Sequence, residues 1–170
     1  MNDPAKKEFY EQATRNLLTQ INNMGLGADD KKNAVYYTRL FRESFKYDEI
    51  KQYMFVNKHS KIWDLGYDSA GFCRISSAAF SIVMGVKDWQ LMCIDANQWD
   101  AGASHHYLKH IPSGKFFDLT YDQFAVEGLV VPYEIGTPAS YQLHNSDIIR
   151  FTDMLDIDVI NILKHGHKRS

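Results

Sequence analysis

Three side chains in this sequence, Cys73, His105 and Asp118, are of the types that together perform nucleophilic chemistry. The thiolate of cysteine, rather than the thiol, is the nucleophile, so a neighbouring base that takes the thiol proton makes the sulfur reactive. A histidine serves as that base and later returns the proton to the leaving group. An aspartate beside the histidine fixes its tautomer and stabilises its positive charge. These residue types predict thiol-dependent acyl transfer if the fold brings them together.

The sequence around Cys73 predicts that this residue begins a buried helix. From Cys73 to Gly85 there is no proline and no internal glycine, and apolar residues recur with helical spacing at Ile75, Ala79, Ile82 and Val83. Gly71 permits a sharp entry turn. A thiol at a helix N-terminus faces the positive end of the helix dipole, which favours the thiolate. The alternative is a structural cysteine, because free cysteine is among the most buried residue types.

Two strands after this helix are expected to carry the histidine and the aspartate. Residues 101–111 and 115–119 have strand-like sequences, and Pro112-Ser113-Gly114 between them is a good turn sequence. If the turn is a simple type I turn, Asp118 shares a face with His105. If Gly114 instead forms a bulge, the face flips and His106 joins Asp118. The register alone leaves both histidines open as the base.

These segments, in this order, resemble the papain-like and transglutaminase-like cysteine hydrolases. They are more specifically similar to a bacterial and phage group with Gly-x-Cys, Ser-His-aromatic and Asp-Leu-Thr-x-x-Gln-Phe motifs, which stand here as Gly71–Ser77, Ser104–Leu108 and Gly114–Phe124. At His106 this group more often has tryptophan, so the chain departs from the pattern there. The resemblance covers roughly residues 70–125 and implies a catalytic triad of Cys73, His105 and Asp118.

A metal site is the competing interpretation of the histidines. Adjacent histidines on a strand point to opposite faces, so His105 and His106 cannot both bind one ion there. His106 and His110 share a face but lie about 13 Å apart along an extended strand. We therefore predict no metal and no cofactor, and we expect His110, next to the turn, to be partly solvated.

Several other residues have two readings. The backbone N–H of Cys73 is one expected oxyanion donor, and a side-chain donor is left open among Asn57, Asn97 and Gln98. Gln123 is either catalytic or a buried amide that ties the strand to the next loop. Three aromatic residues before or beside the nucleophile either line a substrate groove or belong to the core: Trp63, Tyr67 and Phe72. The second cysteine, Cys93, is expected in the core of a strand at residues 89–94.

The rest of the chain predicts an α+β fold with N-terminal helices. A first helix from Pro4 should bury Phe9, Ala13, Leu17, Ile21 and Met24. A second, capped by Asp29 or Asp30, should bury Val35, Tyr36, Leu40 and Phe41. A short third helix is expected within residues 47–56, a loop at 57–72, a helical turn at 121–127 and an irregular segment at 129–142. A last helical region should run from Asn145 to about Lys164, with a break near residues 156–158.

The composition favours one domain spanning residues 1–170, in which the Cys73 helix packs on an antiparallel sheet. The 19 basic and 21 acidic residues give no electrostatic argument for nucleic acid, and the longest weakly polar run is too short for a membrane span. Two cysteines form no disulfide framework, which favours the cytoplasm or the cytosol of a target cell. We therefore expect a cysteine hydrolase that acts on an amide of a protein or peptide. The alternative is a non-catalytic binding module, such as a phage or effector protein that blocks a host factor.

Overall fold

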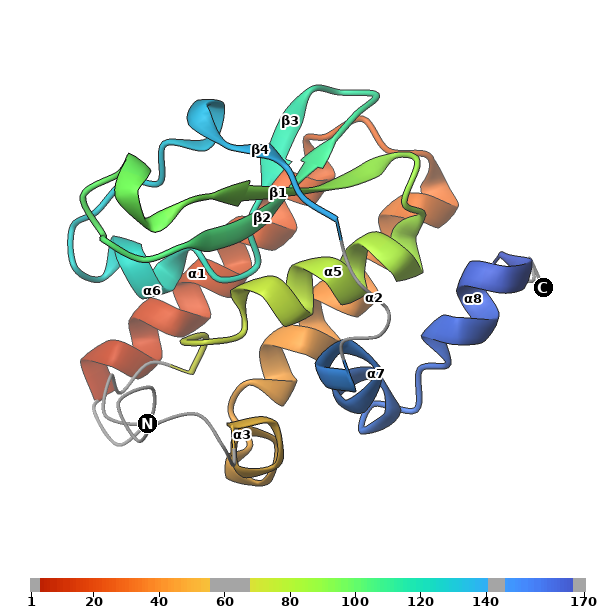
Figure 1. Ribbon diagram of the computed structural model, residues 1–170, viewed down its shortest axis with the longest axis horizontal. Helices are drawn as coiled ribbons and strands as arrows, with labels where there is room; N and C mark the ends of the chain where they lie inside the picture. Colours follow the sequence, from red (N-terminus) through yellow and green to blue (C-terminus); the bar gives the residue numbers. More distant parts are fainter. Residues whose placement is uncertain (1–3, 56–67, 141–145, 167–170) are drawn as a thin grey trace.

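A computed structural model of the chain describes residues 4–55, 68–140 and 146–166. A small sheet lies on one side of a layer of helices, and α5 (Cys73–Met84) runs directly beneath it (Figure 1). The helices α1 (Pro4–Asn22), α2 (Ala28–Ser44) and α3 (Asp48–Phe55) precede α5. The helices α6 (Asp122–Ala125), α7 (Ser146–Asp153) and α8 (Val159–His165) follow the main strands. The fold is α+β with N-terminal helices, as the sequence predicts.

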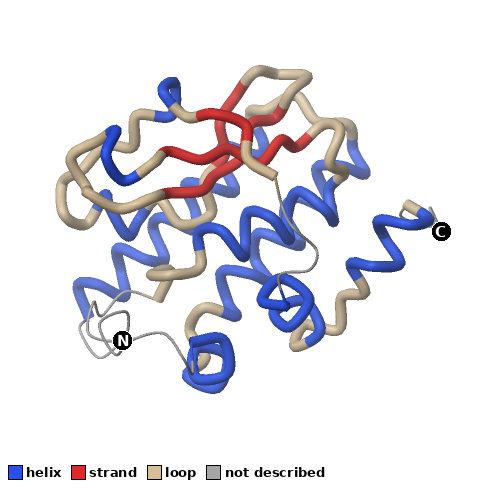
Figure 2. The backbone as a smooth tube through the Cα atoms, in the orientation of Figure 1, coloured by secondary structure: helices blue, strands red, loops and turns tan. Residues whose placement is uncertain are grey.

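Within the described residues, the sheet has four antiparallel strands in the order β3-β2-β1-β4 (Figure 2). They are β1 (Trp89–Ile94), β2 (His105–His110), β3 (Lys115–Phe117) and β4 (Thr137–Pro138). The bounds of β1 agree with the prediction, whereas β2 and β3 are shorter than predicted. The edge strand β4 was not predicted, because two residues in a proline-containing segment carry no strand periodicity.

The central helix α5 is buried on every side rather than along one stripe. Every residue from Ile75 to Val83 is buried, because the helix contacts β1 and β2 on one side and α2, α7 and α8 on the others. A helix that is apolar or small-sided all round suits such a position. Gly85 ends the helix with a φ of 104°, a conformation that glycine adopts readily.

The core lies on both faces of the sheet. On the helix side, Phe80 of α5 packs against Trp89 and Phe117 with ring-centroid distances of 5.1 and 5.3 Å. On the opposite face, Met92, Ile94, Tyr107 and Val131 form a smaller buried cluster. The irregular segment after α6 therefore covers the outer face of the sheet, and β2 is enclosed between two apolar layers.

The N-terminal helices occur where they were predicted, but their buried faces are rotated slightly. In α1 the buried aromatic residue is Tyr10, and Phe9 is 37% exposed. In α2, Tyr36 is 57% exposed, whereas Phe41 is fully buried as predicted. Val35 and Leu40 are only partly buried, because the buried stripe of α2 runs through Ala34, Thr38, Phe41 and Arg42.

The predicted cap of α2 was wrong, whereas the later helical boundaries follow the predictions. The N-cap of α2 is Gly27 and not Asp29 or Asp30, which lie in the first turn, where carboxylates complement the helix dipole without capping. The predicted break in the last helical region separates α7 from α8, and Asp156 has a φ of 57° there. The predicted helical turn at 121–127 corresponds to α6.

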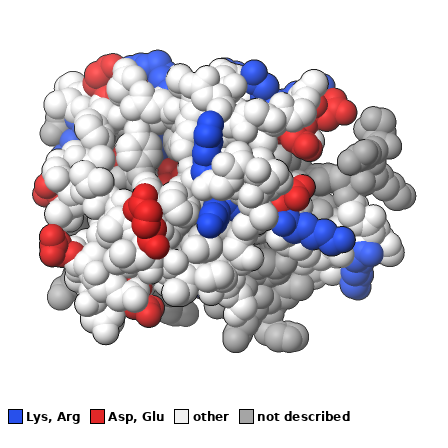
Figure 3. Space-filling model, turned by 90° about the horizontal axis from the view of Figure 1, so that it is seen from above, with Lys and Arg blue, Asp and Glu red and all other residues white. Residues whose placement is uncertain are grey.

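The surface carries both signs of charge. On the face seen from above, basic and acidic side chains are dispersed among uncharged ones (Figure 3). Within the described ranges, no helix has the length and apolar character needed to cross a membrane.

Candidate active site

A tight turn directly before α5 places Cys73 at the first position of this helix. Gly71 has a φ of 81°, and the Phe72 N–H donates to the Ser69 carbonyl over 3.3 Å. Phe72 is fully buried and stacks on Phe45 at a centroid distance of 4.5 Å, so it belongs to the core rather than to a substrate groove. Cys73 is the first residue of the helix and is only partly buried. Its N–H is therefore one of the first-turn groups that a helix leaves without an intrahelical partner.

The register of β2 and β3 places Asp118 on the face of His105. Leu108 pairs with Phe117 and His110 with Lys115, which is the register of the simple turn and not that of the bulged one. His105 Nε2 lies 2.6 Å from Asp118 Oδ2, and the two side chains are fully and almost fully buried. Because a carboxylate only accepts hydrogen bonds, Nε2 carries the hydrogen.

The Asp118 carboxylate has further donors around it. Its Oδ1 accepts from the Thr120 N–H over 3.0 Å and from the Thr120 hydroxyl over 3.3 Å. Its Oδ2 also accepts from the Tyr133 hydroxyl over 3.1 Å. A carboxylate held at both oxygens can fix the orientation of the imidazole that it contacts.

The Cys73 thiol lies beside both His105 and His106. Burial raises the pKa of Cys73, but hydrogen bonds with the side chains of His105 and His106, the charge of His105 and a backbone hydrogen bond at His106 outweigh it and lower the pKa to about 6. Its ordinary value is 9.0. With this pKa the Cys73 thiol is half ionised at about pH 6 and mostly thiolate at neutral pH.

The pKa of His105 is shifted in the opposite direction, upward. Burial lowers its pKa, but the charge of Asp118, the hydrogen bond to Asp118 and the hydrogen bond to Cys73 outweigh burial and raise the pKa to about 10. Since Asp118 occupies Nε2, Nδ1 is the nitrogen left for the thiol. Nδ1 is buried and has no partner of strict hydrogen-bond geometry among the described residues, so its interaction with the nearby Cys73 sulfur is looser than the bond from Nε2–H to Asp118. Between about pH 6 and 10 the pair is a thiolate beside an imidazolium.

Aromatic side chains enclose the His105 ring. Phe124 meets it edge to face at a centroid distance of 4.7 Å, and Trp99 and Tyr107 lie 6.1 Å away. Trp99 is itself fixed by the hydrogen bond from its Nε1–H to the Ala103 carbonyl. This apolar surrounding strengthens the electrostatic interactions of His105 with its two neighbours.

The other candidates from the sequence fall outside this cluster or have structural roles. The Gln123 amide is partly buried and donates to the Thr120 carbonyl over 3.1 Å, so its contact is a local one at the start of α6 rather than the predicted tie to a strand. Gln98 is exposed, and its side-chain oxygen accepts from the Asp95 N–H; Asn97 is also exposed. Asn57, Trp63 and Tyr67 lie outside the described residues.

Two expectations were wrong. His110 is buried instead of solvated, because its ring packs on Trp89 at 4.7 Å and its Nδ1 pairs with Ser113 Oγ. Cys93 is partly exposed instead of being a core residue, because it lies near the end of β1 opposite His106. Burial nevertheless raises the pKa of Cys93, and Asp95 and Cys73 raise it further. The pKa of Cys73 is therefore below that of an ordinary thiol, and the pKa of Cys93 is above it.

Sequence reasoning missed Tyr133 as a partner of Asp118. Tyr133 belongs to a short 3-10 helix (Tyr133–Ile135) in the segment that was expected to be irregular, where no periodicity indicates which side chain turns inward. Thr120 lies within the Asp-Leu-Thr motif, so that motif was a signal for its contact with Asp118. No group of three or more His, Cys, Asp or Glu residues in the described part of the chain is arranged to hold a metal ion.

Comparisons of this chain with protein-family models, with curated proteins and with solved structures find no match. The geometry of Cys73, His105 and Asp118 is therefore the basis on which a function can be proposed.

Proposed function

We propose that the protein is a thiol-dependent acyl-transfer enzyme that acts on an amide through Cys73, His105 and Asp118. The observation that carries this proposal is the position of His105, which lies beside the Cys73 thiol and binds Asp118 through Nε2 at 2.6 Å. The cysteine at a helix N-terminus and the two following strands also resemble the papain-like and transglutaminase-like hydrolases, which supports the same reading. The substrate is a peptide bond, an isopeptide bond or a glutamine side chain in a protein or peptide.

The proposed reaction begins from the thiolate–imidazolium pair. The Cys73 sulfur attacks the amide carbonyl carbon, and the carbonyl oxygen gains the negative charge that the N–H groups at the start of α5 stabilise. The Nδ1–H of His105 then protonates the leaving nitrogen as the C–N bond breaks. Water or an amine, deprotonated by His105, attacks the thioester and releases Cys73. Asp118 keeps the imidazole in the orientation that both proton transfers need.

The direct test is the pH dependence of Cys73 alkylation by iodoacetamide, followed by mass spectrometry of the peptides that contain each cysteine. In the wild type, Cys73 should react fast with a midpoint at about pH 6, and Cys93 should react slowly at neutral pH. Asp118→Ala should move the midpoint upward, so that the rate falls far more at pH 6 than at pH 9. Superimposable profiles for the two proteins would refute the triad.

Turnover separates the enzyme from the binding module. Candidate protein substrates incubated with wild type should gain new N-termini, lose ammonia from glutamine or acquire cross-links, and each product is distinguished by mass. Cys73→Ala serves as the matched control because alanine removes the sulfur, is small and favours the helix that Cys73 begins. A binding module would give equal results with both proteins, and its partner would be bound by Cys73→Ala as well as by wild type.

A further inference from the structure

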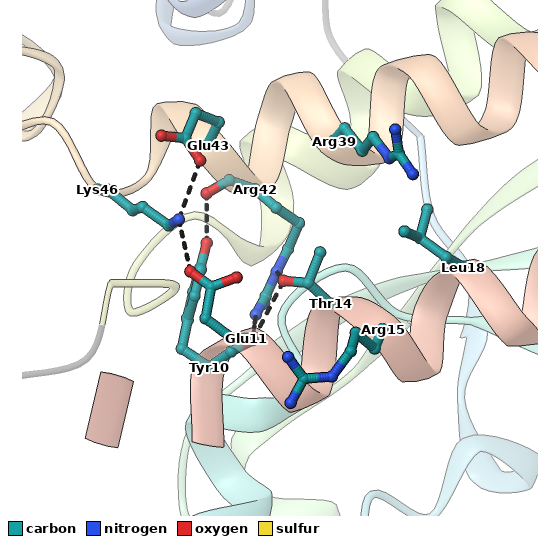
Figure 4. A pocket seen from close by; sticks show the side chains of 9 residues that line it. All are labelled: Tyr10, Glu11, Thr14, Arg15, Leu18, Arg39, Arg42, Glu43 and Lys46. Carbon is teal, nitrogen blue, oxygen red and sulfur yellow. Dashed lines mark hydrogen bonds and ion pairs between the residues drawn. The ribbon is translucent and has the colours of Figure 1, made fainter. Parts of the chain in front are cut away.

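The guanidinium of Arg42 is a buried charge away from the Cys73 thiol. Arg42 lies near the end of α2 and is 1% exposed. Its Nε–H donates to Thr14 Oγ1 over 3.0 Å, and one terminal nitrogen donates to the Tyr10 carbonyl over 2.9 Å. Figure 4 shows the side chain extending from α2 toward α1, at a pocket of about 380 Å³ that Arg42 and Tyr10 help to line. A buried charge of this kind is stable only with such partners.

The other terminal nitrogen of Arg42 reaches the segment that follows Asp118. It donates to the Leu119 carbonyl over 3.0 Å and forms an ion pair with Asp122 Oδ1 at 2.5 Å. Leu119 is the residue directly after Asp118, so the hydrogen bond holds the backbone next to the carboxylate that binds His105. An arginine suits this position because its planar group presents several donors in fixed directions.

Asp122 connects this segment to the turn before Cys73. Its second oxygen, Oδ2, accepts a hydrogen bond from the Ser69 hydroxyl over 3.0 Å, and both residues are buried. The Ser69 carbonyl in turn accepts the Phe72 N–H in the turn that leads into α5. One carboxylate therefore joins the entry to the Cys73 helix with the segment of Asp118, although the two are far apart in sequence.

We infer that the Arg42–Asp122–Ser69 network positions Cys73 relative to the His105–Asp118 pair. This inference rests on the proposed function, and it makes Arg42 a positioning residue because it touches neither the thiol nor the imidazole in any described contact. Its action is to fix two segments that carry the nucleophile and the aspartate. Small displacements of reacting groups reduce rates strongly, so a rigid link of this kind contributes directly to the reactivity of the thiol.

Ser69→Ala is the sharpest test because it removes one hydrogen bond to Asp122 without changing any charge. The matched control is Ser44→Ala, since Ser44 is equally buried, lies near Arg42 on α2, and its hydroxyl binds only the Phe41 carbonyl of the same helix among the described contacts. The pH–rate profile of Cys73 alkylation is measured for wild type and both variants, together with thermal unfolding to confirm that each is folded.

The expected result is an upward shift of the Cys73 midpoint by about half a pH unit or more in Ser69→Ala, and no shift in Ser44→Ala. A purely structural role predicts a lower melting temperature in both variants with unchanged midpoints, and that result would overturn the inference. Equal shifts in both variants would also overturn it, because they would indicate general loosening of the fold.

Arg42→Lys provides a second test with the charge retained. Lysine keeps a positive charge near Asp122 but lacks the planar group that reaches Thr14, Leu119 and Asp122 at once, so the midpoint should shift in the same direction as in Ser69→Ala. If this variant does not fold, Ser69→Ala alone decides. A wild type with an ordinary Cys73 midpoint would refute the proposed function and this inference together, whereas a low wild-type midpoint that Ser69→Ala leaves unchanged would refute the inference alone.

Discussion

At the scale of single residues, the ring of His105 determines what Cys73 can do. Both imidazoles, His105 and His106, contact the thiol, but within the described contacts a carboxylate pairs only with that of His105. A histidine backed by a buried carboxylate holds its proton more firmly and stays in one orientation. The two histidines are therefore unequal partners of the same sulfur.

We expect His105→Ala to slow Cys73 alkylation at pH 7 by about 100-fold or more, because the imidazolium that stabilises the thiolate is lost. His106→Ala should have a much smaller effect, since the backbone hydrogen bond at His106 and the whole His105–Asp118 pair remain. The measurement is the alkylation rate constant of each variant by mass spectrometry. A large loss confined to His106→Ala would show that His106, and not His105, is the base.

The residues that sequence reasoning found and missed differ in a physical way. Cys73 and Asp118 were found because they stand next to glycine turns and in a motif, where local sequence limits the backbone. Arg42 was missed because a charged residue on a helix is normally interpreted as surface, and its burial depends on carbonyls supplied by Tyr10 and Leu119. Tertiary contacts of this kind leave no local signal.

At the scale of elements, the segment from Val131 to Pro138 lies against the outer face of the sheet. It supplies Tyr133 to Asp118 and ends in β4, which pairs with β1 at Met92 and Cys93. The Tyr107 hydroxyl donates to the Tyr133 carbonyl over 2.5 Å, so β2 holds this segment in place. The contact is close because Gly136 has no side chain: a Cβ there would lie 1.9 Å from the Tyr107 oxygen.

We expect Gly136→Ala to destabilise the protein by about 1–3 kcal/mol, because the methyl group must displace the Tyr107 ring and its hydrogen bond to Tyr133. Urea unfolding measures the loss. The double variant Gly136→Ala/Tyr107→Phe removes the oxygen that overlaps with the new methyl group and should recover part of the lost stability. If the double variant shows only the sum of the two single losses, the overlap is not the cause.

The elements themselves were largely predictable, and their registers were not. The helix at Cys73 and the strand at Trp89–Ile94 follow from apolar or small-sided runs without internal glycine or proline, which suit elements enclosed on both sides. The pairing of Leu108 with Phe117 depends on the conformation of a four-residue turn, and the sequence allowed two. The turn conformation determines whether His105 or His106 faces Asp118. The composition of the site therefore depends on the strand register, which the sequence defines less well than the elements themselves.

At the scale of the whole molecule, the thiolate–imidazolium pair links stability to pH. The Cys73 pKa is about 6 in the folded protein and ordinarily 9.0, so its contribution to stability is fully present above about pH 9 and is lost as the pH falls through 6. The His105 pKa is raised from 6.5 to about 10, so its contribution is fully present below 6.5 and is lost as the pH rises through 10.

The difference in unfolding free energy between wild type and Cys73→Ala isolates the first contribution. This difference should decrease as the pH is lowered from about 9 to 6, with a slope of at most about 1.4 kcal/mol per pH unit. The corresponding difference for Cys93→Ala should stay constant from pH 6 to about 8 and then fall slightly toward pH 9, because the pKa of that thiol is raised in the folded protein while the unfolded thiol begins to ionise. Urea titrations at four or five pH values make the comparison, and a flat difference for Cys73→Ala would mean that the thiol is not ionised in the folded protein.

The chain is synthesised from its N-terminus, so the residues of the site are not made at the same time. Cys73 leaves the ribosome before His105 and Asp118 do, and Arg42 and Ser69 have no Asp122 to bind until still later. Until those partners arrive, Cys73 is an ordinary thiol that is almost entirely protonated at neutral pH. In urea, Cys73 and Cys93 should accordingly be alkylated at similar rates. On the proposed function, a nascent or misfolded copy carries no activated sulfur, and the reactivity of Cys73 is expected only in the completed fold.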